Sequence, residues 1–218
     1  MKKIIFSILF IFGIQISNAE ITTQSLPKKL EHIDISKENK FFRDLYYNEE
    51  INKEELIEKF KEEMHTYNPT ALYSLASYLY INGDTKEAVK YAVMGRMRAR
   101  FDYRRSTHRE TKKGIEFLED NYAKFVPDYI MQNPVEFQQM FEELKKKDTE
   151  IKYLYNPEWI YLYSDLVNGE IPINKVLIVS QEYWRSLYNL AISEVQFDYV
   201  ERIEGAKQLQ KSNQQVFD

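Results

Sequence analysis

The chain has 218 residues, no cysteine, only six glycines and six prolines, and a formal net charge of −4. Without cysteine it has no disulfide and no thiolate metal site, and the few glycines and prolines favour helices over a turn-rich β-protein. The acidic net charge argues against a general nucleic-acid binder. We therefore expect a fold that is held together by its apolar core alone.

The first 19 residues have the three parts of a secretory signal peptide. Lys2 and Lys3 form a charged start, an apolar run follows from Ile4 to Ile14, and the small residues Ser17 and Ala19 precede a cleavage site. The apolar run is shorter than the roughly 20 residues that a transmembrane helix needs. We predict cleavage after Ala19 and a periplasmic or secreted chain without a membrane segment; an uncleaved membrane anchor is the alternative.

The next segments predict a leader and two short helices. Residues 20–35 have no clear periodicity, and we interpret them as a mobile leader. Ser36 is the expected N-cap of a first helix, and Asn52 is the expected N-cap of a second. The second helix has Leu56 and Phe60 four residues apart on its apolar side. Its many glutamates are interpreted as a solvated face.

The stretch from Ala71 to Gly95 predicts two helices joined by a tight turn. Apolar residues recur on one side of the first helix, at Leu72, Leu75, Ala76 and Leu79. Asn82 and Gly83 signal a turn, and Asp84 with Glu87 is a candidate capping pair. Small residues on the second helix allow a close approach, at Ala88, Ala92 and Gly95.

This stretch resembles a tetratricopeptide repeat or the related Sel-like repeat. The residues that carry the resemblance are Leu72, Leu75, Ala76, Leu79 and Ala88. The sequence departs from the family at Ala76, where Gly is usual, at Ala92, where a large aromatic is usual, and in the missing closing proline. One repeat is recognisable, over residues 69–102. The resemblance implies an all-α fold, an irregular superhelix of antiparallel helical pairs with one tetratricopeptide-like unit.

The rest of the chain predicts further helices. Thr107 with Glu110 fits a capping box, with Ile115, Leu118 and Tyr122 on one face of the helix that it opens. Pro134 and Pro157 each fit the first position of a helix, and Gly169 ends the second of these.

The C-terminal third leaves one choice open. The β-branched run Val176–Val179 fits a strand, but we favour the start of a helix that continues through Trp184 and Leu190. A last helix is expected from Gln196 to Leu209. We therefore predict a single all-α domain over residues 36–212 and a polar tail over 213–218.

Charge is distributed unevenly along the mature chain. After removal of the signal peptide 28 basic and 34 acidic residues remain, so the net charge is −6; residues 96–113 carry +6 and the remainder −12. The candidate binding residues in this segment are Arg96, Arg100, Arg104, Arg105, Arg109, Lys112 and Lys113. Because arginine binds carboxylates with two bonds, the segment predicts a surface for a partner protein with an acidic surface. The alternative is that these residues pair with acidic helices of the same chain.

A second candidate surface is aromatic. Tyr73, Ser77 and Tyr80 lie at i, i+4 and i+7, opposite the apolar stripe of their helix. The resemblance implies that this face lines a concave groove that holds a peptide or a partner protein. Tyrosine suits such a surface because its ring is rigid and its hydroxyl is polar.

Catalytic motifs are missing from the sequence. The three histidines are scattered, and no nucleophile elbow, zinc-protease motif or phosphate-binding loop occurs. We expect no catalysis, no metal and no cofactor; a carboxylate pair for sugar-bond hydrolysis is the remaining enzymatic alternative. By fold-level analogy, small exported helical-repeat proteins resemble the immunity partners of envelope-targeting toxins delivered by type VI secretion. The alternative is a periplasmic adaptor for envelope assembly or secretion.

Overall fold

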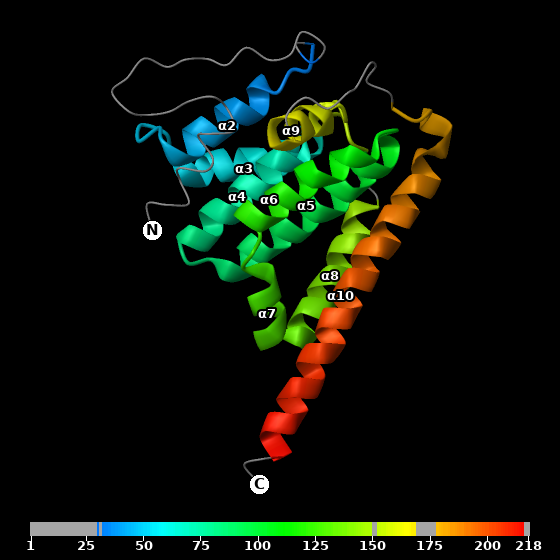
Figure 1. Ribbon diagram of the computed structural model, residues 1–218. Coiled ribbons are helices and arrows are strands. Elements are labelled where there is room, and N and C mark those ends of the chain that lie inside the picture. Colours follow the sequence, from blue (N-terminus) through cyan, green and yellow to red (C-terminus); the bar gives the residue numbers. More distant parts are fainter. Residues whose placement is uncertain (1–29, 31, 150–151, 169–177, 216–218) are drawn as a thin grey trace.

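The computed structural model describes Leu30 and residues 32–149, 152–168 and 178–215, and these confirm the predicted all-α class (Figure 1). The α-helices are α2 (Ser36–Tyr46), α3 (Lys53–Glu63), α4 (Pro69–Ile81), α5 (Thr85–Arg105), α6 (Lys112–Tyr122), α7 (Val126–Gln132), α8 (Pro134–Asp148), α9 (Trp159–Asn168) and α10 (Trp184–Gln215). Three short 3-10 helices, η2 (Met64–Thr66), η3 (Arg109–Thr111) and η4 (Gln181–Tyr183), join some of them. The predicted signal peptide and Gly169 lie outside the described residues.

Helices α4 and α5 form the predicted hairpin at the centre of the molecule. Gly83 turns the chain with a φ of 91°, a conformation that glycine adopts without strain. The side chain of Asp84 then accepts a hydrogen bond from the Glu87 amide and caps α5. The two helices come close where the ring of Tyr73 lies against Gly95: a Cβ atom on that glycine would be only 3.3 Å from the ring.

The N-terminal helices cover one side of this hairpin, and here the structure corrects the predicted leader. Leu30, Ile33 and Ile35 are buried in the core, so folded structure begins before residue 36. Ile35, not Ser36, is the N-cap of α2. The predicted cap of α3 is confirmed, because the Asn52 side chain accepts from two amides of the first turn.

Several helix boundaries differ from those predicted. α6 begins at Lys112 after η3, and the N-caps of these two elements are Thr111 and His108 where Thr107 was expected. α9 begins at Trp159, two residues after Pro157, whereas Pro134 does open α8. α7 was not predicted at all, since its seven residues are too few to show a period.

The start of the C-terminal region is extended, which corrects the preferred helix over Val176–Val179. Ile178 forms an isolated β-bridge with Ser106, and the Val179 amide donates to the Arg105 carbonyl at 2.8 Å. Residues 176 and 177 lie outside the described part. α10 begins only at Trp184.

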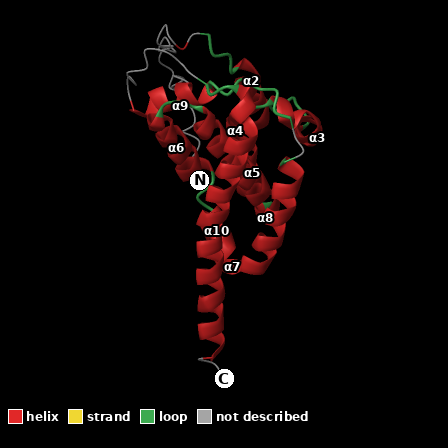
Figure 2. Ribbon diagram, turned by 90° about the vertical axis from the view of Figure 1, so that its right-hand side faces the viewer, coloured by secondary structure: helices red, strands yellow, loops and turns green. Residues whose placement is uncertain are grey.

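Helix α10 replaces two predicted helices. It runs for 32 residues without a break and packs against α5, α7 and α8. It continues to Gln215, so the first residues of the predicted polar tail are helical. Its C-terminal end reaches beyond the other helices (Figures 1 and 2). Among the described helices, none combines the length and the apolar character needed to cross a bilayer.

Candidate functional site

Three of the predicted arginines lie on the side of α5 that faces α10. Arg96 Nη2 is 2.8 Å from Asp198 Oδ2, and Arg100 Nη2 is 3.8 Å from the same atom. One turn further along α5, Arg104 donates from both Nε and Nη2 to the Glu194 carboxylate. Residues four apart share a helix face, so two rows of opposite charge run past each other. We call these five residues the arginine seam; it is the internal pairing that the sequence left open as an alternative.

A second set of charges lies on another side of α5 and is fully buried. Arg98 Nε donates to Asp148 Oδ1 of α8 at 3.0 Å, and Arg105 donates to Asp102. Trp159 Nε1 of α9 donates to Asp102 Oδ2 at 2.6 Å. We call Arg98, Asp102, Arg105 and Asp148 the buried charge network. Each side chain has an exposed fraction of 0 or 1 %.

Arg105 was expected at a partner surface, and its position corrects that expectation. Its guanidinium lies 4.2 Å from the ring centroid of Phe101 and 4.4 Å from that of Trp184, so two aromatic rings shield it from solvent. Only 1 % of the residue is exposed. A folded chain therefore does not present Arg105 as a surface contact.

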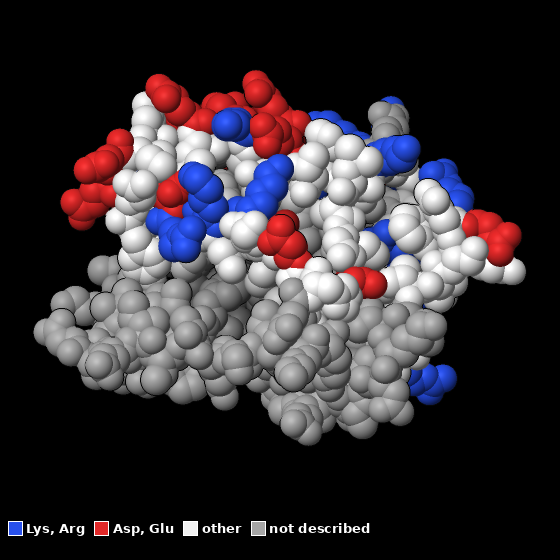
Figure 3. Space-filling model, turned by 90° about the horizontal axis from the view of Figure 1, so that it is seen from above, with Lys and Arg blue, Asp and Glu red and all other residues white. Residues whose placement is uncertain are grey.

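The remaining basic candidates stay at the surface. Arg109, Lys112 and Lys113 are exposed around the start of α6, and Lys112 Nζ is 3.0 Å from Glu116. The arginines of α5 face α10 or the core instead. The predicted basic segment therefore does not form one continuous surface. In the space-filling view many acidic side chains gather at the upper left margin, and others lie near the centre and the right edge among lysines and arginines (Figure 3).

The expected aromatic groove is closed in the structure. Tyr73 and Ser77 are buried, because α6 packs against α4 and the Tyr73 ring lies on Gly95 of α5. Tyr80 is exposed near the end of α4, where its ring stacks on Phe125 at a centroid distance of 4.2 Å. The three residues therefore do not form one open surface.

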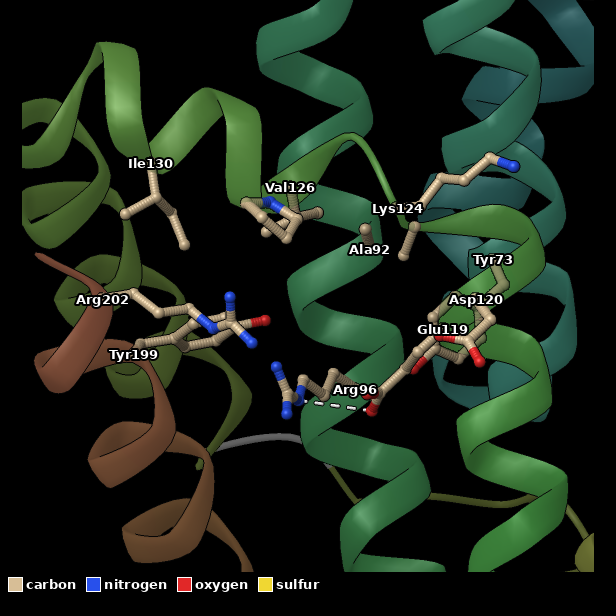
Figure 4. A pocket seen from close by; sticks show the side chains of 12 residues that line it. Tyr73, Ala92, Arg96, Glu119, Asp120, Lys124, Val126, Ile130, Tyr199 and Arg202 are labelled. Carbon is tan, nitrogen blue, oxygen red and sulfur yellow. Dashed lines mark ion pairs between the residues drawn. The ribbon is translucent and has the colours of Figure 1, made fainter. Parts of the chain in front are cut away.

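A cavity of about 190 Å³ lies beside the arginine seam (Figure 4). Arg96 of α5 and Arg202 of α10 point toward the same space, with Tyr199 beside them. Glu119 and Asp120 of α6 lie on the other side of Arg96 from Arg202. The other lining residues are Tyr73, Ala92, Ala123, Lys124, Val126, Pro127 and Ile130. The cavity thus combines a charged wall with an apolar wall.

The charged wall of this cavity is electrostatically coupled to the arginine seam. Arg96 Nε is 3.2 Å from Glu119 Oε1, and its guanidinium carbon lies 5.0 Å from the Tyr199 ring centroid. Burial raises the pKa of the Glu119 carboxyl, and Arg96 and Arg100 offset this only in part. Burial also raises the pKa of Tyr73 well above its usual value. Its hydroxyl has no hydrogen-bond partner among the described residues.

The side of α10 that faces away from the core carries exposed apolar residues. Leu190, Phe197 and Val200 are exposed by 46, 67 and 46 %. Together with Ser193, which is also exposed, they share one side of the helix. Ala191, Val195 and Ile203 on the other side are buried in the core. We call the four exposed residues the outer face of α10.

Sequence reasoning identified Tyr73 and Arg96 but missed Glu119, Tyr199 and Arg202, which complete the cavity. It also missed the outer face of α10, because a helix break was expected before Gln196. A seven-residue recurrence from Leu190 to Phe197 was the available signal. Among the described residues, no group of three or more His, Asp or Glu side chains is placed to hold a metal ion.

Comparison with known proteins returned no match to a family model, a curated protein or a solved structure. The resemblance to a tetratricopeptide or Sel-like repeat therefore stays a prediction from the sequence.

Proposed function

We propose that this chain is an exported, non-catalytic protein-binding module whose partner docks on the outer face of α10. The observation that carries the proposal is the exposure of Leu190, Phe197 and Val200 on one side of one helix. Single exposed apolar side chains are ordinary, whereas several that adjoin on one surface are typical of an interaction site. The arginine seam supports this role, because its ion pairs hold α10 against α5 beside this surface.

The role that we propose first is that of an immunity protein, an inhibitor that covers an envelope-targeting toxin of the type VI secretion kind. A projecting helix on a packed core is convex, and a convex surface suits the concave active site of an enzyme. The alternative role is a periplasmic adaptor for envelope assembly or secretion. Both roles place the chain outside the cytoplasm and need neither cofactor nor metal.

The charge of the partner also follows from the exposed residues. The arginines of the seam are engaged within the chain, whereas Lys146 in the last turn of α8 is exposed and lines a groove between α8 and α10. Lys146 is the group that an acidic side chain of a partner protein would meet beside the outer face of α10.

An affinity pull-down from an envelope extract tests the proposal, with the chain from Glu20 onward as bait. We expect a stoichiometric partner that Phe197→Asp with Val200→Asp abolishes, because two charges would be forced into an apolar contact. Leu154→Asp is the matched control, since Leu154 is equally exposed but lies in the loop before α9.

The identity of the partner separates the two roles. A retained hydrolase or lipase, inhibited by the bait, supports the immunity role, and a set of assembly or secretion components supports the adaptor role. If the double variant retains the same partners as the control, the outer face of α10 is not the contact surface and the proposal is wrong.

A further inference from the structure

The outer face of α10 repeats every seven residues. Large apolar side chains recur at Tyr183, Leu190 and Phe197, and small side chains, two serines and a valine, follow three residues later at Ser186, Ser193 and Val200. All six are exposed, including Tyr183 in η4 directly before the helix. Apolar residues at this spacing form the contact line between packed helices, and small residues between large ones leave holes for the side chains of a second helix.

A groove between α8 and α10 adjoins this line. Its volume is about 590 Å³, and Tyr188 and Ile192 of α10 contribute apolar lining. Ser193 belongs both to the groove and to the outer face of α10. The rest of the lining is polar or charged, so a helix that packs on the outer face has polar and charged groups of this chain along one flank.

The two sides of the outer face carry opposite charge. On one side Lys145 and Lys146 of α8 line the groove together with Glu142, whose carboxylate is paired with Lys145, so Lys146 supplies the unpaired charge. On the other side α10 exposes Glu201, while Glu194 is already bound to Arg104. Within the described residues neither Lys146 nor Glu201 forms an ion pair, so both are available to a partner.

We infer that the element docking on the outer face of α10 is an amphipathic helix of another protein, with carboxylates along the flank that faces Lys146. Its opposite flank carries basic residues toward Glu201. Opposite charges on the two sides fix the orientation of the incoming helix, since reversing it would place like charges together. This inference rests on the proposed function and specifies the partner of the same surface.

Photo-crosslinking in the producing cell tests the inference with the full chain, carrying a photoreactive residue in place of Ser193. The peptide attached to this position is then identified by mass spectrometry. We expect a segment of another protein with apolar residues three, four and seven apart, acidic residues on one flank and basic residues on the other. A second copy of this chain, or a peptide without that pattern, would overturn the inference.

Binding of the identified peptide to the purified chain gives the second measurement. We expect Lys146→Glu and Glu201→Lys each to weaken binding about fivefold, as exposed ion pairs do, and the loss to shrink at high salt. Lys113→Glu on α6 is the control of the same chemistry at a distant surface and should leave binding unchanged. Equal affinities for all variants would contradict the charged flanks.

The two proposals fail in different ways. If Phe197→Asp with Val200→Asp abolishes the pull-down but the crosslinked segment lacks the helical pattern, the protein-binding function stands and the inferred partner helix is wrong. If the double variant still retains the partners, the outer face of α10 is not the docking surface, and both the proposed function and the inferred partner helix are wrong.

Discussion

The arginine seam and the buried charge network use the same residue types on the same helix in different surroundings. Asp148 in the network is completely buried and is contacted by Arg98, Tyr153 and Tyr188. Asp198 in the seam keeps 40 % of its side chain exposed. A buried charge must be fully compensated, because the protein interior solvates it poorly, whereas water solvates a partly exposed charge even when its partner is lost. The two sets therefore contribute to the protein in different ways.

The difference comes from the position of each arginine around α5. Residues at intervals of four, as in Arg96, Arg100 and Arg104, share one face, which here lies along α10. Arg98 and Arg105 are seven apart on another face, which α8 and α9 cover together. Arg96 and Arg98 are only two positions apart on α5. One therefore belongs to the seam beside α10, and the other belongs to the buried network inside the core.

The largest expected effect follows from removing one charge of the buried network. Asp148→Ala leaves Arg98 buried without its carboxylate, and we expect the free energy of unfolding to fall by about 3–5 kcal/mol. Asp198→Ala in the seam is the matched change, for which about 0–1 kcal/mol is expected. Urea unfolding of the two variants measures both losses. Equal losses would remove the distinction between the two regions.

The same pair of positions also tests the cause of that loss. If the penalty in Asp148→Ala comes from the uncompensated charge of Arg98, the double change Arg98→Met with Asp148→Leu should restore much of the stability. A double variant as unstable as Asp148→Ala would show instead that the hydrogen bonds of Tyr153 and Tyr188 to Asp148 dominate.

A smaller, pH-dependent effect is expected at Glu119, where the seam meets the cavity. Its pKa in the folded chain is raised above the model-peptide value of 4.5, mainly by burial. The folded state therefore binds more protons than the unfolded state between these two pKa values, so stability falls as the pH rises through this interval. Glu119→Gln should remove this fall, as measured by urea unfolding from about pH 4 to about pH 8.

Glu136 supplies the opposite case for this measurement. Its pKa is lowered, first by the hydrogen bond from Lys86 and then by that from Tyr129, so its contribution to stability is lost as the pH falls. Glu136→Gln should therefore flatten the curve on acidification instead. If Glu119→Gln leaves the pH dependence unaltered, the carboxyl is not held in the buried position described.

The smallest effect is expected for a single ion pair of the seam. Arg104 and Glu194 are exposed by 33 and 28 %, so a double-mutant cycle with Arg104→Ala and Glu194→Ala should give a coupling energy of about 0.2–1 kcal/mol that decreases with salt. A coupling of several kcal/mol that is independent of salt would place the seam in the same class as the buried network.

Local signals were sufficient for the central hairpin and several caps. Asn52 and Asp84 cap helices as their positions predict, and Pro134 opens α8. These features depend on hydrogen bonds and dihedral angles within a few residues, so a short stretch of sequence contains the whole interaction. The same holds for Gly83, whose positive φ is required by the turn alone.

The candidate site depended on contacts between distant parts of the chain. Arg96 meets Asp198, and Arg98 meets Asp148, across separations of 102 and 50 residues. A sequence shows that an arginine is charged, but whether its partner is a carboxylate of the same chain or of another protein depends on which helices pack together. Tyr73 is the clearest case, because α5 and α6 cover a face that the repeat pattern would leave open.

The sequence by itself thus determined the helical class, the hairpin α4–α5 and the uneven charge, since periodicity, turn residues and composition are local properties. Only the tertiary structure decided that Arg105 is buried, that two expected helices are the single helix α10, and that Phe197 remains in solvent. The physical reason is that burial depends on the helices that pack around a residue, and most of those helices are far away in the chain.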